Sequence, residues 1–224
     1  MKKQLLLLAV ALFATATAVR AQAPVQINST NFPDENFRAV VAGTDIDKDA
    51  DGYLSDKEIA AVTELDVGEK NIASLKGIEF FTALKRLWCY SNQMTSLDVS
   101  KNTALTLLSC FNNQIKEDQM QTLVNSLPTV TGGKFWVIDT KNSNEQNVCT
   151  EPQVKIATDK GWKVNDFNGG SSQEYAGSEV TAIRSIEVSP ETKSHWYTLD
   201  GKRLSGKPTQ KGIYVRNGRK VVVK

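Results

Sequence analysis

The sequence predicts an α/β fold in which a solenoid of short strands and turns follows a helical cap and precedes a small antiparallel β domain. Three observations predict it. A pattern of leucines recurs every 21 or 22 residues in the middle of the chain, which is typical of stacked repeats. A twelve-residue acidic loop comes before this pattern, and apolar runs joined by Asp-Gly and Asn-Gly turns come after it. We place the boundaries at 1–21 for a signal peptide, 22–61 for the cap, 62–170 for the solenoid with its closing units, 171–180 for a linker and 181–224 for the β domain.

The first residues have the pattern of a secretory leader. Lys2 and Lys3 form a charged start, Leu5 to Ala18 form an apolar core, and small residues precede a cut after Ala21. The apolar run is too short to span a bilayer comfortably, and no further run of this kind follows. We therefore expect an exported chain without a transmembrane helix.

Charge is unevenly distributed along the chain. Without the leader, 24 basic and 25 acidic residues remain. Residues 22–170 hold 14 basic and 20 acidic groups, whereas residues 181–224 hold 10 basic and 3 acidic groups, which suggests two modules. A basic tail suits nucleic acid or an anionic surface. Its charges alternate with strand-forming residues, which favours a solvated β face and no nucleic-acid partner.

The acidic loop has the spacing of an EF-hand calcium loop. Gly52 occupies the sixth position, where the chain turns sharply. The six ligand positions hold Asp47, Asp49, Asp51, Tyr53 through its carbonyl, Ser55 through a water, and Glu58. We predict a Ca²⁺ cofactor with a structural role, since a single loop lacks the partner hand of regulatory sensors. The alternative is a solvated turn with a Ser55–Glu58 capping box, and both can hold together.

Helical segments are expected on both sides of the loop. Pro33 in a first helical turn marks the entry helix, and Phe37, Val40 and Val41 follow at helical spacing. The exit helix is expected to carry Ile59, Ala60 and Val62. The cap is therefore predicted to be a helix–loop–helix unit.

The middle of the chain is a leucine-rich repeat array. Residues 84–94 read LKRLWCYSNQM, and residues 105–115 read LTLLSCFNNQI, which matches the pattern L-x-x-L-x-L-x-x-N. Each unit is one short strand and a turn that cannot bury its own apolar face, so neighbours must stack. The asparagine at the end of each strand is expected to hold the turn through side-chain hydrogen bonds.

Three cysteines allow at most one disulfide. Cys89 and Cys110 occupy the same inward position in successive repeats, so they are expected on adjacent strands about 4.8 Å apart. Parallel side chains rarely give the dihedral angle of a disulfide, and we therefore expect buried thiols.

The array is expected to close with two larger βα units. Residues 119–127 and 151–160 fit amphipathic helices, and residues 134–139 and 162–167 fit strands. These units would cover the open end of the solenoid. The Gly-Gly-Ser-Ser stretch at 169–172 is predicted to begin a linker.

Side chains between the inward positions face the concave side of a solenoid. The predicted ligand-binding residues on this face are Arg86, Trp88, Tyr90, Leu107 and Phe111. An exposed apolar cluster of this kind suits a protein partner or the sugar rings of a glycan. The alternative is that these side chains only cover the array's edge or meet the C-terminal module. A register shift of one residue would bury them.

The C-terminal 44 residues predict a small antiparallel domain. Residues 183–188 alternate as a strand, and two hairpins are expected over 196–204 and 212–224.

Particular stretches resemble known bacterial proteins. Residues 71–97 resemble the internalin type of repeat. Residues 27–176, with FPDENFR at 32–38 and TSLDVSKNTAL at 95–105, resemble bacterial surface proteins that carry an EF-hand loop before such repeats. The end of the chain, with YTLDGKRL at 197–204 and KGIYV at 211–215, resembles type IX sorting domains. This resemblance implies export through residues 181–224 and a place on the outer-membrane surface of a Gram-negative bacterium. An ordinary β appendage is the alternative.

Enzymatic chemistry finds little support in the sequence. The single histidine, His195, lies in the tail, and no nucleophile–base constellation, phosphate-binding glycine loop or zinc spacing is present. We predict a secreted or cell-surface calcium-binding recognition module for an extracellular protein or glycan, and not an enzyme. A scaffold without a specific ligand and an accessory to a hydrolase remain as alternatives.

Overall fold

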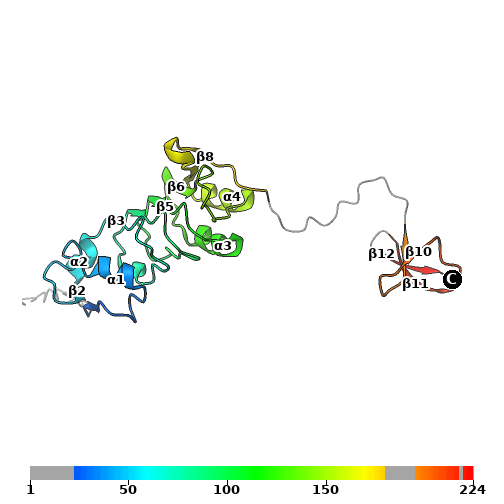
Figure 1. Ribbon diagram of the computed structural model, residues 1–224, viewed down its shortest axis with the longest axis horizontal. Coiled ribbons are helices and arrows are strands. Elements are labelled where there is room, and N and C mark those ends of the chain that lie inside the picture. The colour runs from blue at the N-terminus through cyan, green and yellow to red at the C-terminus, as the bar shows by residue number, and fades with distance from the viewer. Residues whose placement is uncertain (1–22, 180–194, 217–218, 224) are drawn as a thin grey trace, which may run out of the picture. The chain divides into compact units, whose positions relative to one another are not determined.

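The computed structural model describes residues 23–179, 195–216 and 219–223. They form two compact units that divide between Val180 and Thr181, and Figure 1 shows the elements of each unit. The predicted leader, the strand at 183–188 and the Asn217-Gly218 turn lie outside the described residues.

The larger unit is a solenoid built on one six-stranded sheet. Its first five strands are parallel and its last pair is antiparallel. The strands stack in chain order, β3 (Glu64–Asp66), β4 (Arg86–Trp88), β5 (Leu107–Ser109), β6 (Gly133–Ile138), β7 (Trp162–Asp166) and β8 (Gln173–Glu174). The predicted α/β solenoid is therefore present, and the register is the one that the leucine spacing indicated.

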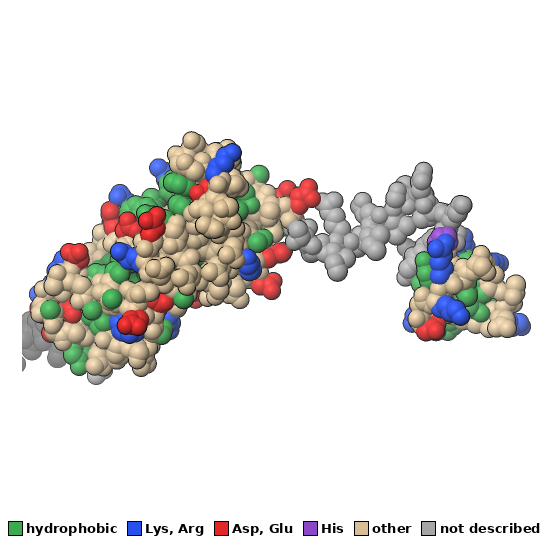
Figure 2. Space-filling model, viewed as in Figure 1, with side chains coloured by type: hydrophobic (Ala, Val, Ile, Leu, Met, Phe, Trp, Pro, Cys, Tyr) green, Lys and Arg blue, Asp and Glu red, His purple; other side chains and the backbone are tan. Residues whose placement is uncertain are grey.

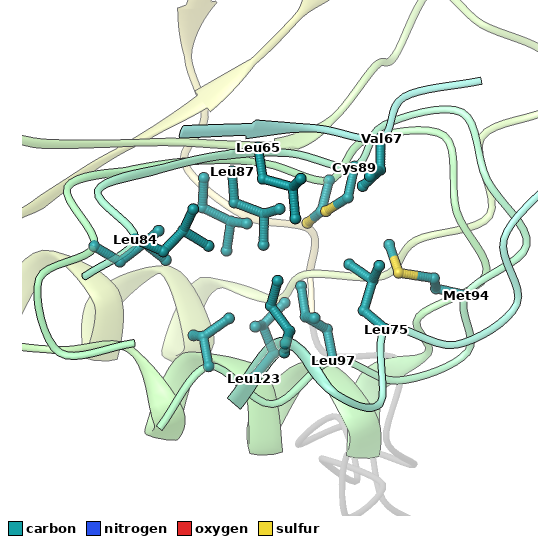
Figure 3. Close-up of a cluster of buried hydrophobic side chains, with 14 of the residues drawn as sticks. Leu65, Val67, Leu75, Leu84, Leu87, Cys89, Met94, Leu97 and Leu123 are labelled. Atoms are coloured by element: carbon teal, nitrogen blue, oxygen red, sulfur yellow. The ribbon is translucent and has the colours of Figure 1, made fainter. Parts of the chain in front are cut away.

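The inward side chains form one continuous core. Leu65 aligns with Leu87, and Leu87 with Leu108, and all three are buried. The same row continues into Phe135 and Val164 of the larger closing units. Figure 3 shows Leu65 and Leu87 on one side of this core, facing Leu97 and, from helix α3 (Glu117–Ser126), Leu123 on the other side. No single repeat encloses this apolar space, so the core exists only because the units stack.

A ladder of buried asparagines holds successive turns. Asn92 donates from Nδ2 to the carbonyls of Val67 and Cys89, and its Oδ1 accepts from Ile72 N–H. Asn113 repeats this arrangement one turn later. Asn147, which the sequence pattern did not identify, continues it by donating to Cys110 and Val137 and accepting from Ile115. Each side chain satisfies backbone groups of two turns that would otherwise be buried without partners.

The N-terminal cap consists of α1 (Glu35–Val41), β2 (Tyr53–Leu54) and α2 (Asp56–Ala61). Asp34 is the N-cap of α1 and accepts from Phe37 N–H at 3.0 Å. Pro33 therefore precedes the helix, whereas the sequence analysis placed it inside the first turn. The other oxygen of Asp34 accepts from Ala73 N–H at 2.8 Å and Ser74 N–H at 3.1 Å. One carboxylate thus starts the helix and attaches the cap to the first repeat.

Two helices cover the other end of the solenoid, as expected. α3 packs beside α4 (Glu151–Asp159), and α4 packs on β7. Thr150 and Gln153 form a capping box at the start of α4. The short 3₁₀ helices η1 (Ile78–Phe80) and η2 (Asn168–Gly170) complete the turns.

The predicted linker at 171–180 begins too early. β8 pairs antiparallel with β7, with Asn165 opposite Glu174. Farther on, an isolated bridge joins Ser178 to Thr150, and Tyr175 Oη donates to the Cys149 carbonyl at 3.1 Å. Residues 171–179 therefore fold back onto the closing units. The Gly-Ser composition indicated flexibility, but the glycines serve a turn: Gly169 and Gly170 have φ of 63° and 98°.

The smaller unit is a four-stranded antiparallel sheet in the order β10-β9-β11-β12. Its strands are β9 (Trp196–Tyr197), β10 (Arg203–Leu204), β11 (Gly212–Arg216) and β12 (Arg219–Val223). Trp196 is buried, with the Arg216 guanidinium 5.1 Å from its ring centroid. The expected hairpin around Asp200-Gly201 is present, and Gly201 adopts a φ of 86° in its turn.

The three thiols lie in the interior of the larger unit. Cys89, Cys110 and Cys149 are all buried and free, as predicted for the first two. In the described part of the chain, no helix combines the length and the apolar character needed to cross a lipid bilayer.

Candidate calcium loop and aromatic groove

Three carboxylates of the acidic loop converge. One oxygen from each of Asp47, Asp49 and Glu58 lies within 4.8 Å of the other two. Calcium binds oxygens at about 2.3–2.6 Å, so two ligands of one ion lie at most about 5.2 Å apart. These three residues can therefore hold a cation together.

The carboxylate of Asp47 is oriented for this purpose. Its Oδ2 accepts from Gly52 N–H at 3.1 Å, which closes the loop, while its buried Oδ1 has no hydrogen-bond partner. A buried charged oxygen without a partner is costly, and a bound cation would satisfy it. The donor set is all oxygen, which suits Ca²⁺ better than a soft metal. The residues present therefore fit the predicted ion.

Glu58 joins the loop to the exit helix. Its Oε1 accepts from Lys48 N–H at 2.7 Å, and its Oε2 accepts from Ser55 N–H at 2.8 Å and from Ser55 Oγ at 2.7 Å. The bonds from Ser55 are the main reason that the pKa of Glu58 lies below its usual value. Ser55 also caps α2, so the capping box and the convergence of carboxylates coexist.

The remaining predicted ligands lie outside this three-residue group. Asp51 Oδ1 accepts from Tyr53 N–H at 2.8 Å, and Tyr53 exposes 42% of its surface. Burial, followed by the charge of Asp51, raises the pKa of Asp49. Several negatively charged carboxylates thus lie close together in the loop, as expected for a cation-binding site.

A strand that the sequence analysis did not predict supports the loop. β1 (Val25–Gln26) pairs antiparallel with β2, placing Val25 opposite Leu54, and Ile27 N–H donates to the Gly52 carbonyl at 2.9 Å. Leu54 is fully buried. The segment before the cap therefore supplies backbone pairing to the loop.

The predicted concave face carries a stack of three aromatic rings. The rings of Tyr90 and Phe111 lie 5.1 Å apart at 10°, and those of Phe111 and Phe167 lie 4.3 Å apart at 9°. Tyr90 also lies flat over Gly68, where a Cβ atom would come within 2.6 Å of the ring. Phe111 is consequently buried at 6% exposure. The expectation that Phe111 is exposed was wrong, because Phe167 from a later unit covers it.

The stack lines a groove of about 630 Å³. Trp88, Tyr90, Phe111, Trp136 and Phe167 supply its aromatic side chains, and Asp66, Glu69 and Asp139 supply its carboxylates. Trp88, Tyr90 and Trp136 are half-buried, so each keeps an accessible part. We call this set of residues the aromatic groove. Figure 2 shows acidic and hydrophobic side chains next to one another on the visible face of the larger unit.

Two of the predicted binding residues do not line the groove. Arg86 Nη1 pairs with Glu64 Oε1 at 2.8 Å on the neighbouring strand, and both side chains are about half exposed. Leu107 is half-buried beside them. The structure therefore brings Trp88, Tyr90 and Phe111 together and separates Arg86 and Leu107 from them.

Sequence reasoning missed the contributions of the closing units to the groove. Trp136 is positioned by a hydrogen bond from its Nε1 to Ser172 Oγ at 2.7 Å. Phe167 follows Asp166, whose Oδ1 accepts from the N–H groups of Thr140 and Asn168. The register of Trp136 against Ser109 indicates that it shares the concave face, whereas nothing local to Phe167 marks it.

Two carboxylates, those of Glu145 and Asp139, hold the loops at the edge of the groove. Glu145 Oε2 accepts from the N–H groups of Asn112 and Asp139, both at 2.7 Å. Burial raises the pKa of Glu145, although these backbone bonds oppose the rise. Asp139 Oδ1 accepts in turn from Gly169 N–H at 2.9 Å. Hydrogen bonds from backbone N–H groups to these carboxylates therefore fix the loops that border the groove.

Comparisons with known proteins bear on the repeat. No protein-family model matches the chain. Over 72 residues, 32% of the chain, it is 40% identical to Internalin J of Listeria monocytogenes serotype 4b (strain F2365), with the same values for Internalin J of a serovar 1/2a strain. The repeat segment is internalin-like. The match spans 8% of each relative's length.

Two solved structures of Listeria monocytogenes proteins align with part of this chain. The functional domain of InlJ is 28% identical with a TM-score of 0.44, and the comparison covers 62% of this chain and 32% of that one. Internalin C2 is 19% identical with a TM-score of 0.45, covering 66% of this chain and 73% of that one.

Proposed function

We propose that this chain is a secreted or surface-displayed recognition protein, without enzymatic activity, that binds a protein or glycan outside the cell through the aromatic groove. The observation that carries the proposal is the groove itself. Half-buried Trp88, Tyr90 and Trp136 line a hollow of about 630 Å³, a size typical of ligand sites. Aromatic side chains of this kind often dominate binding energy. The internalin-like repeat supports a place in this class.

In this proposal, calcium would stabilise the cap at the N-terminal end of the solenoid. Asp47, Asp49 and Glu58 would hold the ion, with Asp51, Tyr53 and Ser55 completing the six loop positions. A bound ion would neutralise the crowded carboxylates and so fix the cap that Asp34 attaches to the first repeat.

A pair of matched variants tests the calcium proposal. Isothermal titration of the chain over 22–224 should show Ca²⁺ binding, and Glu58→Gln should abolish it because one loop oxygen loses its charge. Asp45→Asn, which changes an exposed acid just outside the loop, should bind as the unmodified chain does. Equal binding by Glu58→Gln would contradict the site.

The recognition proposal is tested with arrays of immobilised glycans and extracellular proteins. The labelled chain should bind particular spots in the presence of calcium. The Trp88→Ala plus Tyr90→Ala variant should lose them, because it removes two walls of the groove. Lys101→Ala plus Thr103→Ala alters an exposed turn that does not line the groove and should retain them. Binding that survives in the aromatic variant would exclude the groove.

Residues 181–224 are proposed to direct export across the outer membrane of a Gram-negative bacterium. Their resemblance to type IX sorting domains supports this. A chain truncated after Val180 should accumulate in the periplasm of a host that has this export route, whereas the full chain reaches the surface. Normal surface display of the truncated chain would exclude the sorting role.

A further inference from the structure

The charged groups of the aromatic groove all have one sign. Asp66, Glu69 and Asp139 line it, and neither lysine nor arginine is among its lining residues within the described part of the chain. Arg86, a predicted binding residue, is paired with Glu64 and lies outside the lining. A ligand that enters the groove therefore meets negative charge and no positive charge.

The uncharged polar side chains of the lining can both donate and accept hydrogen bonds, and one acceptor among them has no partner. Asn112 and Asn142 line the groove, and the buried Oδ1 of Asn112 has no hydrogen-bond partner. The Asn112 N–H is occupied by Glu145, and its Nδ2 lies 3.4 Å from Ser91 Oγ. An orphaned acceptor beside three carboxylates favours a ligand that brings hydrogen-bond donors.

The aromatic walls suit a cation as well. Trp88, Tyr90 and Trp136 present ring surfaces within the same hollow as the three acids, and ring faces attract ammonium and guanidinium groups. Burial raises the pKa of the Tyr90 phenol, and the charges of Asp66 and Glu69 raise it further. The negative charge therefore reaches the aromatic stack.

We propose that the aromatic groove receives a lysine or arginine side chain presented by a segment of a partner protein. The inference rests on the proposed function and specifies its ligand. A neutral sugar brings no positive charge to Asp66, Glu69 and Asp139, which are the only charged residues of the lining within the described part of the chain. Its volume of about 630 Å³ exceeds one side chain, so several residues of the partner enter. The excess of acidic over basic residues in 22–170 would also steer a basic segment towards the groove.

The experiment follows the indole N–H signals of the ¹⁵N-labelled chain over 22–224, with calcium, by NMR titration. The probes are capped five-residue peptides of glycine and serine with a central lysine or arginine. A peptide with central glutamine is the neutral match, and chitotriose is the sugar probe. Trp88 and Trp136 report on the groove, while Trp162, whose Nε1 donates to Pro128 O inside the core, serves as an internal reference.

The lysine and arginine peptides should shift the Trp88 and Trp136 signals, and the glutamine peptide should not. Asp66→Asn plus Glu69→Gln should weaken binding at least about tenfold, since charge-assisted contacts are lost. Asparagine at position 66 keeps an acceptor for Gly68 N–H, so the local turn is retained. Asp118→Asn plus Glu151→Gln makes the same charge change at exposed positions away from the groove and should bind normally.

The other outcomes overturn the inference. If the glutamine peptide bound as tightly as the lysine and arginine peptides, the positive charge would not contribute to binding. If chitotriose binds and the cationic peptides do not, the ligand is a sugar and not a basic segment. The proposed recognition function would then still hold. Unchanged Trp88 and Trp136 signals with every probe would exclude a basic segment, while the array experiment would still decide whether the groove binds anything.

Discussion

At the residue scale, single polar side chains hold this solenoid together. Asn92 and Asn113 lie 21 residues apart and bond equivalent backbone groups, so the repeat pattern predicts both. Asn147 has the same role but follows Asn113 by 34 residues. The longer turn of the closing unit breaks the period, and the pattern therefore missed this third asparagine.

Asn113→Ala should lower the free energy of unfolding by about 2–4 kcal/mol, because it leaves the carbonyls of Cys89 and Cys110 and the N–H of Met94 without their partner. Urea denaturation measures the change. Asn144→Ala, an exposed turn position, should change stability by less than about 0.5 kcal/mol. Similar effects of both substitutions would argue against the ladder.

Asp166 predicts a pH dependence. Burial alone would raise its pKa, but the hydrogen bonds from Thr140, Asn168 and Gln173 together hold the pKa below the usual 3.8. A depressed folded pKa contributes stability above pH 3.8 that is lost as the pH falls through the folded value. Asp166→Asn should therefore be less stable at neutral pH, and its stability should fall less between about pH 4 and pH 2.

Thermal unfolding at a series of pH values measures this effect, with the exposed Asp118→Asn as control. Parallel stability curves for Asp166→Asn and the unmodified chain below pH 4 would show that the carboxylate does not act through its charge. Because Asp166 precedes Phe167, the asparagine variant should also loosen the stack over Phe111.

At the element scale, the N-terminal strand is the unexpected feature. β1 pairs with β2 inside the acidic loop, and its two residues are too few to give a strand signal in the sequence. A two-residue pair has little stability of its own. It forms because Leu54 is fully buried and the Gly52 carbonyl receives the Ile27 N–H.

Removal of β1 should weaken the proposed calcium loop. A chain that begins at Asn28 lacks Val25 and Ile27 and should bind Ca²⁺ more weakly than one that begins at Val25, because ordering the loop then costs more conformational entropy. Both chains lack the exposed Ala23 and Pro24, so the comparison isolates the strand. Calcium titration measures the difference, and equal affinities would show that the strand is dispensable.

At the scale of the whole molecule, the stacked core encloses every thiol. Cys89, Cys110 and Cys149 all belong to one buried hydrophobic core. Burial raises the pKa of each thiol, that of Cys149 to about 12. A thiol reagent at pH 8 should therefore react with almost none of them in the native chain.

In guanidinium chloride, all three thiols should react, since the core opens as a unit. The absorbance of the chromophore that the thiol reagent releases gives the number of thiols that have reacted. One thiol that reacts rapidly in the native chain would identify a closing unit that opens locally, and peptide mapping would locate it.

Local spacing along the chain predicts those parts of this protein whose residues lie close together in the sequence. The carboxylate spacing from Asp47 to Glu58 and the leucine period place their side chains through local geometry alone, so both could be predicted. The boundary of the linker was predicted less well. The fold of residues 171–179 depends on pairing with β7, and the local sequence contains no signal for this pairing.

The aromatic groove, in contrast, depends on contacts between residues that lie far apart in the chain. Phe167 lies 56 residues after Phe111, yet their rings stack at 4.3 Å because the closing units fold back beside the repeats. That contact buries Phe111, and the same units bring Trp136 and Asp139 to the hollow. Repeat spacing predicts which face a side chain occupies, but the neighbours across that face come from the stacking of distant units.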